Sequence, residues 1–355
     1  MRRVGGLFDA VVERENLLLA FWKASRGKSA RPDRQAYAAN LEAETEALRA
    51  GLLDGSYPVG NYSQFTIFDP KERIITAAPF RERVLQHALM NVCEPFFDKW
   101  LVSDSYASRR GKGQLAAVEK ASVLAGRFEW FLKCDIRKFF DSVPHDLLRA
   151  ALRRKFKDLR LLGWFDRIIA TYEMSPGRGL PIGNLTSQHF ANFYLDPLDR
   201  TAADLGGVDH AFASQQRGGR LQTAGAPSTT RSGFVRYMDD FVFWSDDRLF
   251  LLGVRDRIGK FVRDALGLEL KGGPFLNRTR LGMDFLGYRI FPRRKILSRS
   301  SRDRYRRNLR RLERWRRDGI VSCREFQRRA DAIGAFAAHA DCLTWRRNLH
   351  ERIFA

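Results

Sequence analysis

The sequence predicts an α+β fold in which an antiparallel sheet is backed by helices. Short β-prone runs stand at Trp130–Leu132, Phe234–Met238 and Phe241–Trp244. Between them lie longer segments such as Val84–Val92 and Ile258–Leu266, in which apolar residues recur at the spacing of one helix face. Two β-prone runs that are almost adjacent in the sequence are typical of a hairpin that returns to a single sheet.

The composition favours a nucleic-acid partner. Among 355 residues there are 63 Lys and Arg against 41 Asp and Glu, a formal charge of +22. Such an imbalance costs self-repulsion unless a polyanion relieves it. A basic surface without a partner and a membrane surface are the alternatives. No run of about 18 apolar residues is present, the N-terminus lacks a signal-like apolar core, and the four cysteines form no C-x-x-C pair. We therefore expect a cytoplasmic protein with reduced thiols and no membrane association.

Four further segments complete the predicted outline. We expect a helix over Arg34–Leu53, a hairpin over Tyr62–Ile75 and a strand over Phe285–Ile290. The stretch 206–232 is rich in Gly, Ser, Thr and Gln, which predicts a mobile loop.

Carboxylates at the ends of β-prone runs predict a metal site. Asp239 and Asp240 follow Tyr237-Met238 between two such runs, and adjacent carboxylates in a tight turn raise each other's pKa unless a cation neutralises them. Magnesium prefers carboxylate ligands. Asp135 ends another apolar run about a hundred residues upstream. It supplies a third carboxylate for a two-ion site of the kind used in phosphoryl transfer. An ordinary acidic hairpin turn is the alternative.

These residues stand in motifs that resemble those of reverse transcriptases, over nearly the whole chain from about Glu15 to Leu349. Lys133–Ser142 (KCDIRKFFDS) resembles their first catalytic motif, Tyr237–Asp240 (YMDD) their catalytic hairpin, and Phe285–Tyr288 (FLGY) their primer grip. The resemblance implies an RNA-directed DNA polymerase, a nucleotidyltransferase shaped like a right hand. Fingers would occupy 1–128, an antiparallel palm sheet 129–290 with the loop 206–232, and a basic helical thumb 291–355.

Within that superfamily, Gly179–Gln188 (GLPIGNLTSQ) resembles the enzymes of diversity-generating retroelements, because Ile182 stands where most reverse transcriptases carry Gln. Asp69–Arg73 and Asp104–Gly113 resemble the same enzymes. This implies mutagenic retrohoming, in which a template-repeat RNA is copied with errors at adenines. An aliphatic Ile182 cannot hydrogen-bond the nascent pair, which removes a geometric check on pairing. The alternative is that Ile182 only packs at a helix start.

The resemblance also assigns roles to single residues. The catalytic and metal-binding set is Asp135, Asp239 and Asp240 with the carbonyl of Ile136, and Lys271 is a candidate general acid for pyrophosphate release. Candidate nucleotide-binding residues are Lys71, Arg73, Phe140, Ile182 and Gln188, where the Phe140 ring would exclude a ribose 2′-hydroxyl. Candidate nucleic-acid-binding residues are Arg109, Arg110, Lys112, Tyr237, Met238, Gly287, Tyr288, Arg306 and Arg310.

The arginine-rich stretch Arg299–Arg317 predicts a thumb helix whose apolar stripe carries Tyr305, Leu309 and Leu312. Basic density without base specificity suits a heteroduplex, which is recognised by its shape and phosphates. The implied cofactors are two Mg²⁺ ions, with Mn²⁺ as a substitute. The implied partners are template RNA, a DNA or RNA primer, dNTPs and a small basic accessory variability protein. Two rival interpretations remain: a stand-alone defence or retron-like reverse transcriptase, and a non-catalytic RNA-binding scaffold with the same fold.

Overall fold

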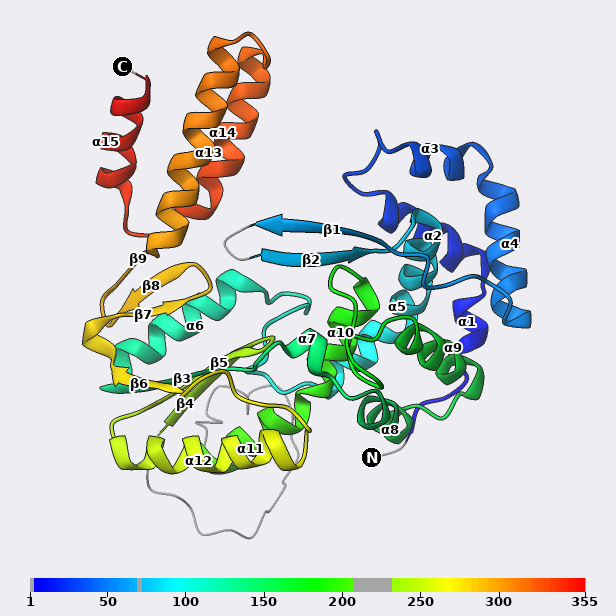
Figure 1. The fold of residues 1–355 in the computed structure, drawn as a ribbon, viewed down its shortest axis with the longest axis horizontal. Coiled ribbons are helices and arrows are strands. Elements are labelled where there is room, and N and C mark those ends of the chain that lie inside the picture. Colours follow the sequence, from blue (N-terminus) through cyan, green and yellow to red (C-terminus); the bar gives the residue numbers. More distant parts are fainter. Residues whose placement is uncertain (1–2, 69–71, 207–231, 355) are drawn as a thin grey trace. The chain divides into compact units, whose positions relative to one another are not determined.

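The computed structural model describes residues 3–68, 72–206 and 232–354. The chain is a mixture of helix and sheet, and its elements follow one another as drawn in Figure 1. It divides into two compact units. Unit 1 comprises Met1–Arg110, Asp135–Thr201 and Arg257–Gly273, and unit 2 comprises Gly111–Cys134, Ala202–Asp256 and Pro274–Ala355. Within the described residues, no helix is long and apolar enough to cross a membrane.

Unit 1 is mostly helical. Its elements are α1 (Phe8–Val11), α2 (Arg14–Ser25), α3 (Pro32–Ala39), α4 (Leu41–Asp54), β1 (Ser63–Phe68), β2 (Glu72–Ala77), α5 (Phe80–Trp100), α7 (Phe139–Ser142), α8 (His145–Lys155), α9 (Leu159–Ala170), α10 (Leu185–Tyr194) and the start of α11 (Asp196–Gly206). Helix α5 contacts α2 and α10. The ring of Phe97 on α5 lies 5.3–6.5 Å from those of Phe156, Phe165, Phe190 and Phe193, so aromatic side chains from four segments form the core.

Unit 2 contains most of the β-structure. Its elements are α6 (Gln114–Arg127), β3 (Trp130–Asp135), β4 (Ser232–Tyr237), β5 (Asp240–Ser245), β6 (Phe275–Arg278), the 3₁₀ turn η2 (Thr279–Leu281), β7 (Met283–Phe285), β8 (Tyr288–Phe291), β9 (Arg294–Leu297), α13 (Arg299–Arg317), α14 (Cys323–Ala337) and α15 (Leu343–Phe354). Helix α12 (Arg248–Asp264) begins in unit 2 and ends in unit 1. Helix α13 contacts both α14 and α15, and the stripe Tyr305, Leu309 and Leu312 predicted for it is buried.

The larger sheet has the strand order β4-β5-β3-β6. Strand β4 is antiparallel to β5, and β3 is antiparallel to β6. Helix α6 contacts β4. A Cβ atom at Gly233 would stand 2.5 Å from Leu124 of that helix, so glycine allows the helix to approach the strand closely. A separate three-stranded antiparallel sheet has the order β7-β8-β9.

Two predicted elements are wrong in their extent. The single helix expected over Arg34–Leu53 is two helices, α3 and α4, because Asn40 leaves the helical region at φ −122° and ψ 34°. The single strand expected over Phe285–Ile290 is the end of β7, a turn and most of β8. That turn reverses at Leu286 and Gly287, both at positive φ. An alternating apolar pattern does not reveal a tight turn unless the turn residues are typical ones, and Leu286 is not.

Some predictions fall on residues that the structure does not describe. The loop expected at 206–232 lies outside the described residues except at its two ends, and so does Lys71. The four cysteines are described: Cys93, Cys134 and Cys342 are buried, Cys323 is exposed, and all four are free thiols.

Candidate active site

The hairpin of β4 and β5 presents the predicted acidic pair. Tyr237 pairs with Asp240, so Met238 and Asp239 alone form the turn. Met238 has φ +53°, a left-handed conformation that costs a non-glycine residue about 1–2 kcal/mol. The fully buried Arg236 donates from Nη1 to the Met238 carbonyl at 3.1 Å, which supports the strained turn from inside the sheet.

Asp240 is placed beside the end of strand β3 within unit 2. Its Oδ2 lies 3.0 Å from Nζ of Lys133, and its side chain is 24% exposed. The neighbouring Cys134 thiol has its pKa raised to about 12, first by burial and second by the negative charge of Asp240. The tip of the hairpin therefore carries a carboxylate directed toward Lys133 and Cys134, the two residues that precede Asp135 on β3.

Asp135 is the last residue of β3, and a second lysine holds it within unit 1. Its Oδ2 lies 3.1 Å from Nζ of Lys271. The two backbones are also joined, because Lys271 N donates to the Asp135 carbonyl at 2.8 Å and Ile136 bridges Leu270. Asp135 is thus anchored by its main chain, and its lysine partner is half-exposed.

These carboxylates fit a divalent cation by donor type. Carboxylate oxygens are the ligands that magnesium prefers. One oxygen of Asp135 and one oxygen of Asp240 each lie beside a lysine ammonium group. Each carboxylate therefore already stabilises a positive charge. Within residues 3–68, 72–206 and 232–354, no three His, Cys, Asp or Glu side chains gather closely enough to hold a metal ion. Whether Asp135, Asp239 and Asp240 form one metal site therefore stays a prediction.

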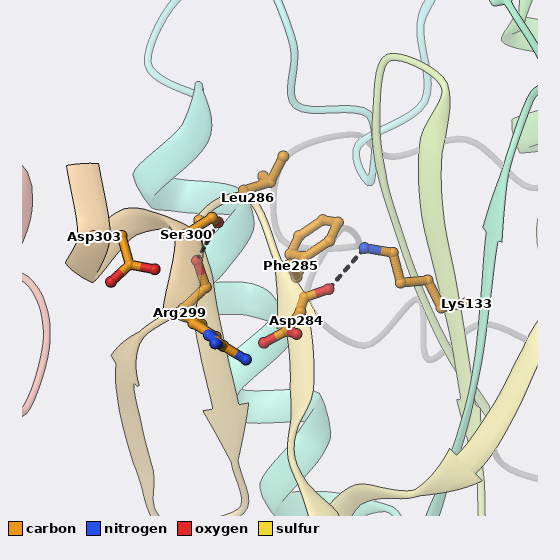
Figure 2. Close-up of a pocket in the computed structure, with 9 residues that line it drawn as sticks. Lys133, Asp284, Phe285, Leu286, Arg299, Ser300 and Asp303 are labelled. Atoms are coloured by element: carbon orange, nitrogen blue, oxygen red, sulfur yellow. Dashed lines mark hydrogen bonds between the residues drawn. The ribbon is translucent and has the colours of Figure 1, made fainter. Parts of the chain in front are cut away.

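The predicted primer-grip turn borders a cavity of unit 2 with a volume of about 490 Å³. Figure 2 shows Lys133 directed toward this turn, where its Nζ donates to the Asp284 carbonyl at 2.7 Å. A Cβ atom at Gly287 would stand 2.9 Å from both Phe336 and Ser301, and Gly287 has φ +87°, so only glycine fits. Tyr288 is fully buried and donates to the Phe336 carbonyl at 2.8 Å. Tyr288 therefore supports the turn and is not exposed to a ligand.

The candidate nucleotide-binding residues that are described lie in unit 1. Thr76 at the end of β2 donates its N–H to the Ile182 carbonyl at 2.9 Å, which ties the β1–β2 ribbon to the segment before α10. Arg73 is exposed on that ribbon. Ile182 and Phe140 are half-buried. Gln188 is exposed and accepts a hydrogen bond from Ser108 Oγ at 3.3 Å.

The candidate nucleic-acid-binding arginines differ in their accessibility. Arg109 is only 8% exposed and lies 2.6 Å from Asp98, whereas Arg110 is 71% exposed and 3.2 Å from Glu94. On α13, Arg306 lies 3.2 Å from Asp303 and Arg310 is exposed. The burial of Arg109 favours a structural role. Lys112 is half-buried.

Sequence reasoning missed Lys133 and Arg236. Lys133 joins the hairpin tip to the β7–β8 turn, since it contacts both Asp240 and the Asp284 carbonyl. Its position two residues before Asp135 on one face of a strand was the available signal. Arg236 stands in a strongly apolar run, where a charged residue is rarely buried without a specific partner.

Comparison with known proteins identifies the family to which this chain belongs. Residues 69–290, more than half of the chain, match the family model described as reverse transcriptase (RNA-dependent DNA polymerase). Protein YkfC of Escherichia coli is 23% identical over 287 residues, which are 72% of this chain and 73% of that protein. The group II intron-encoded protein LtrA of Lactococcus lactis subsp. cremoris is 21% identical over 302 residues, 71% of this chain and 50% of that protein.

Many relatives are longer than the matched region. The match covers only 17% of an uncharacterized 91 kDa protein in the cob intron of Schizosaccharomyces pombe, at 28% identity over 140 residues. A chain in the solved partial Cas6-RT-Cas1–Cas2 complex aligns with 73% of this chain and 43% of its own length, with a TM-score of 0.38 and 18% identity. The family model, which spans the acidic hairpin, Asp135 and the Ile182 segment, establishes that this chain belongs to the reverse transcriptase (RNA-dependent DNA polymerase) family.

Proposed function

We propose that this chain synthesises DNA on an RNA template, with Asp135, Asp239, Asp240 and the carbonyl of Ile136 as the ligands of two Mg²⁺ ions. The observation that carries the proposal is the position of Asp240, which the strained hairpin directs toward the last residues of β3, immediately before Asp135. When bound, the two ions would activate the primer 3′-hydroxyl and neutralise the leaving pyrophosphate.

The other side chains have simpler tasks in this proposal. Lys271, whose Nζ lies 3.1 Å from Asp135 Oδ2, would give a proton to the leaving pyrophosphate. Arg73, together with Lys71, would clamp the triphosphate. The Phe140 ring would exclude a ribose 2′-hydroxyl by its volume. In this proposal the fingers, palm and thumb follow residues 1–128, 129–290 and 291–355.

Within the family, we assign the chain to the error-prone type of diversity-generating retroelements, working with a small basic accessory protein. The support is the sequence around Ile182, which lacks a polar side chain where the nascent pair would be checked. Thr76 N donates to the Ile182 carbonyl, which ties the backbone at this position to strand β2. A second candidate is an enzyme that copies intron RNA, favoured by its likeness to the intron-encoded LtrA.

The test of polymerase activity is primer extension with purified protein, an RNA template, an annealed primer and dNTPs. We expect full-length DNA with Mg²⁺, none after chelation with EDTA, and recovery with Mg²⁺ or Mn²⁺. A DNA-templated reaction run in parallel measures the preference for RNA. If neither metal nor either primer type gives product, also with the accessory protein added, the chain is a scaffold and not a polymerase.

The retroelement type predicts a particular variant effect. Replacing Ile182 with Gln is expected to lower misincorporation opposite template adenines by about fivefold, since one hydrogen bond contributes about 1 kcal/mol to discrimination. Sequencing of the cDNA measures it. Ile182→Leu, which conserves volume and polarity, is the matched control and should keep the parent error rate. Equal error rates in all three proteins would contradict the fidelity role.

A further inference from the structure

A cluster of positive side chains lies where the end of α2 meets the first turns of α5. The sequence from Lys23 to Arg34 carries five basic residues and a single acid, Asp33. Helix α5 contributes Arg83 and the half-buried His87, and α2 and α5 are in extensive contact. We call this set the α2–α5 cluster; its members are Lys23, Arg26, Lys28, Arg31, Arg83 and His87.

Neutral groups hold three of these cations in place. Lys23 Nζ donates to Asn91 Oδ1 at 2.6 Å, Lys28 Nζ to the Ala24 carbonyl at 3.0 Å, and Arg83 Nε to the Ala78 carbonyl at 2.8 Å. Such bonds orient a cation without cancelling its charge. Arg31 alone has a carboxylate partner in the described structure, Asp33 at 2.7 Å.

Several arginines elsewhere in unit 1 are paired with carboxylates, whereas Arg167 and Arg178 bond main-chain carbonyls. Arg14 lies 2.6 Å from Glu42, Arg49 lies 3.5 Å from Glu46, and Arg153 pairs with Asp166. A basic protein could satisfy the α2–α5 cluster in the same way with nearby acids. Among the described residues, no carboxylate lies within ion-pair distance of Lys23, Arg26, Lys28 or Arg83, and what distinguishes these four is that their charges act together on one side chain, His87.

The concentration of charge changes how the cluster titrates. The pKa of His87 is lowered to about 4 by burial and then by the charges of Lys28, Lys23, Arg26 and Arg83. Burial, followed by neighbouring arginines, also lowers the pKa values of Lys28 and Arg83. The groups repel one another, and a bound anion would relieve that repulsion.

An exposed aromatic ring accompanies the cations. Trp22 on the last turn of α2 is 58% exposed and immediately precedes Lys23. Its ring packs against Phe21 at 5.1 Å edge to face, which fixes its base while leaving the outer face open to solvent. An exposed ring beside several cations is the arrangement that binds single-stranded nucleic acid, by base stacking together with phosphate contacts.

We propose that the α2–α5 cluster and Trp22 bind the phosphate backbone of single-stranded RNA, with one base stacked on the indole. This inference rests on the proposed copying of an RNA template and adds a separate contact for that strand, on the N-terminal helices. Lys23, Arg26 and Lys28 bind the phosphates, and Arg31 and Arg83 extend the positive field.

The test is the salt dependence of RNA binding, measured by fluorescence anisotropy with a labelled RNA of about 12 nucleotides. In the triple variant Lys23→Gln/Arg26→Gln/Lys28→Gln, we expect the slope of log affinity against log salt to fall by about 2, since each single-strand phosphate contact contributes about 0.7. Affinity should fall at least about tenfold at moderate salt. Trp22→Ala should reduce affinity by about fivefold or more with little change in slope.

The matched control is the triple variant Arg14→Gln/Arg49→Gln/Arg153→Gln, which removes the same charge from carboxylate-paired positions of the same unit. It should keep the parent slope. Thermal unfolding of both variants should stay cooperative and well above the assay temperature, so that a change in slope reports lost charge and not unfolding. A cluster variant with the same slope as the control variant overturns the proposal.

Two further experiments are needed. One distinguishes RNA from free phosphate as the ligand, and the other distinguishes RNA binding at the cluster from the proposed polymerase activity. Inorganic phosphate at the same phosphate concentration should not displace the RNA; if it competes equally, the site takes a free anion and the RNA assignment is wrong. Asp240→Asn should keep RNA affinity while losing primer extension. If the parent protein fails to polymerise, the binding experiment still tests this inference, because it measures RNA affinity and not DNA synthesis.

Discussion

Replacement of Asp240 with Asn is expected to lower the rate of primer extension by at least about a thousandfold. A carboxylate that helps to hold a catalytic ion contributes several kcal/mol to transition-state stabilisation, and each 1.4 kcal/mol is about tenfold in rate. Asn has the same shape but no charge, so it cannot balance a divalent ion. Single-turnover extension on a saturating template–primer measures the chemical step directly.

The fold should tolerate this change. The ion pair between Asp240 and Lys133 is about three-quarters buried, and Lys133 keeps its bond to the Asp284 carbonyl when the carboxylate is lost. We expect a loss of about 1 kcal/mol in the free energy of unfolding. Asp256→Asn, which removes a carboxylate from an exposed pair with Arg255, is the matched control and should retain parent activity. Activity within tenfold of the parent in Asp240→Asn would remove Asp240 from the catalytic set.

Replacement of Arg109 with Gln is expected to destabilise the protein by about 2–3 kcal/mol, because a nearly buried guanidinium is lost together with its hydrogen bonds to a carboxylate and to main-chain carbonyls. The guanidinium lies 2.6 Å from Asp98 Oδ1 and also donates to the carbonyls of Asp98, Ser105 and Val102. It ties the end of α5 to the loop that follows. Chemical denaturation monitored by circular dichroism measures the effect.

The neighbouring Arg110 is the matched control. Its side chain is 71% exposed and lies 3.2 Å from Glu94, so Arg110→Gln should change stability by less than about 0.5 kcal/mol. The pair of variants also separates two roles for the 104–113 segment. A large fall in RNA affinity with unchanged stability in Arg109→Gln would restore Arg109 to the nucleic-acid-binding residues that its sequence motif indicates.

The sequence predicts those parts of the fold in which local pattern and tertiary role coincide. The hairpin around Asp239 and Asp240 is predicted because two β-prone runs flank a turn, and β4 and β5 pair in that register. The arginine-covered helix is predicted because Tyr305, Leu309 and Leu312 repeat at helical spacing, and α13 buries them. Both features depend on neighbours in the sequence.

Features that depend on distant contacts could not be predicted. In the sequence, Lys133 is indistinguishable from other basic residues. Its contacts with Asp240 and the Asp284 carbonyl follow only from the folded arrangement of β3 and β7. The sequence motif around Arg109 indicates a phosphate ligand, but in the folded protein this arginine pairs with Asp98 of α5. The α2–α5 cluster was missed for the same reason, because His87 and Arg83 are about sixty residues from Lys23. Charge counts alone cannot show which cations the fold leaves without acids.

The lysines beside Asp135 and Asp240 mean that these two acids have counter-ions before any magnesium arrives. In the proposed two-ion site, neither carboxylate would be left without a neighbouring cation when the metal is withdrawn. A chelator should therefore act on this protein as a reversible off-switch rather than as a denaturant. We expect protein that is loaded with RNA without the ion to stay inactive and to start synthesis when the ion is added.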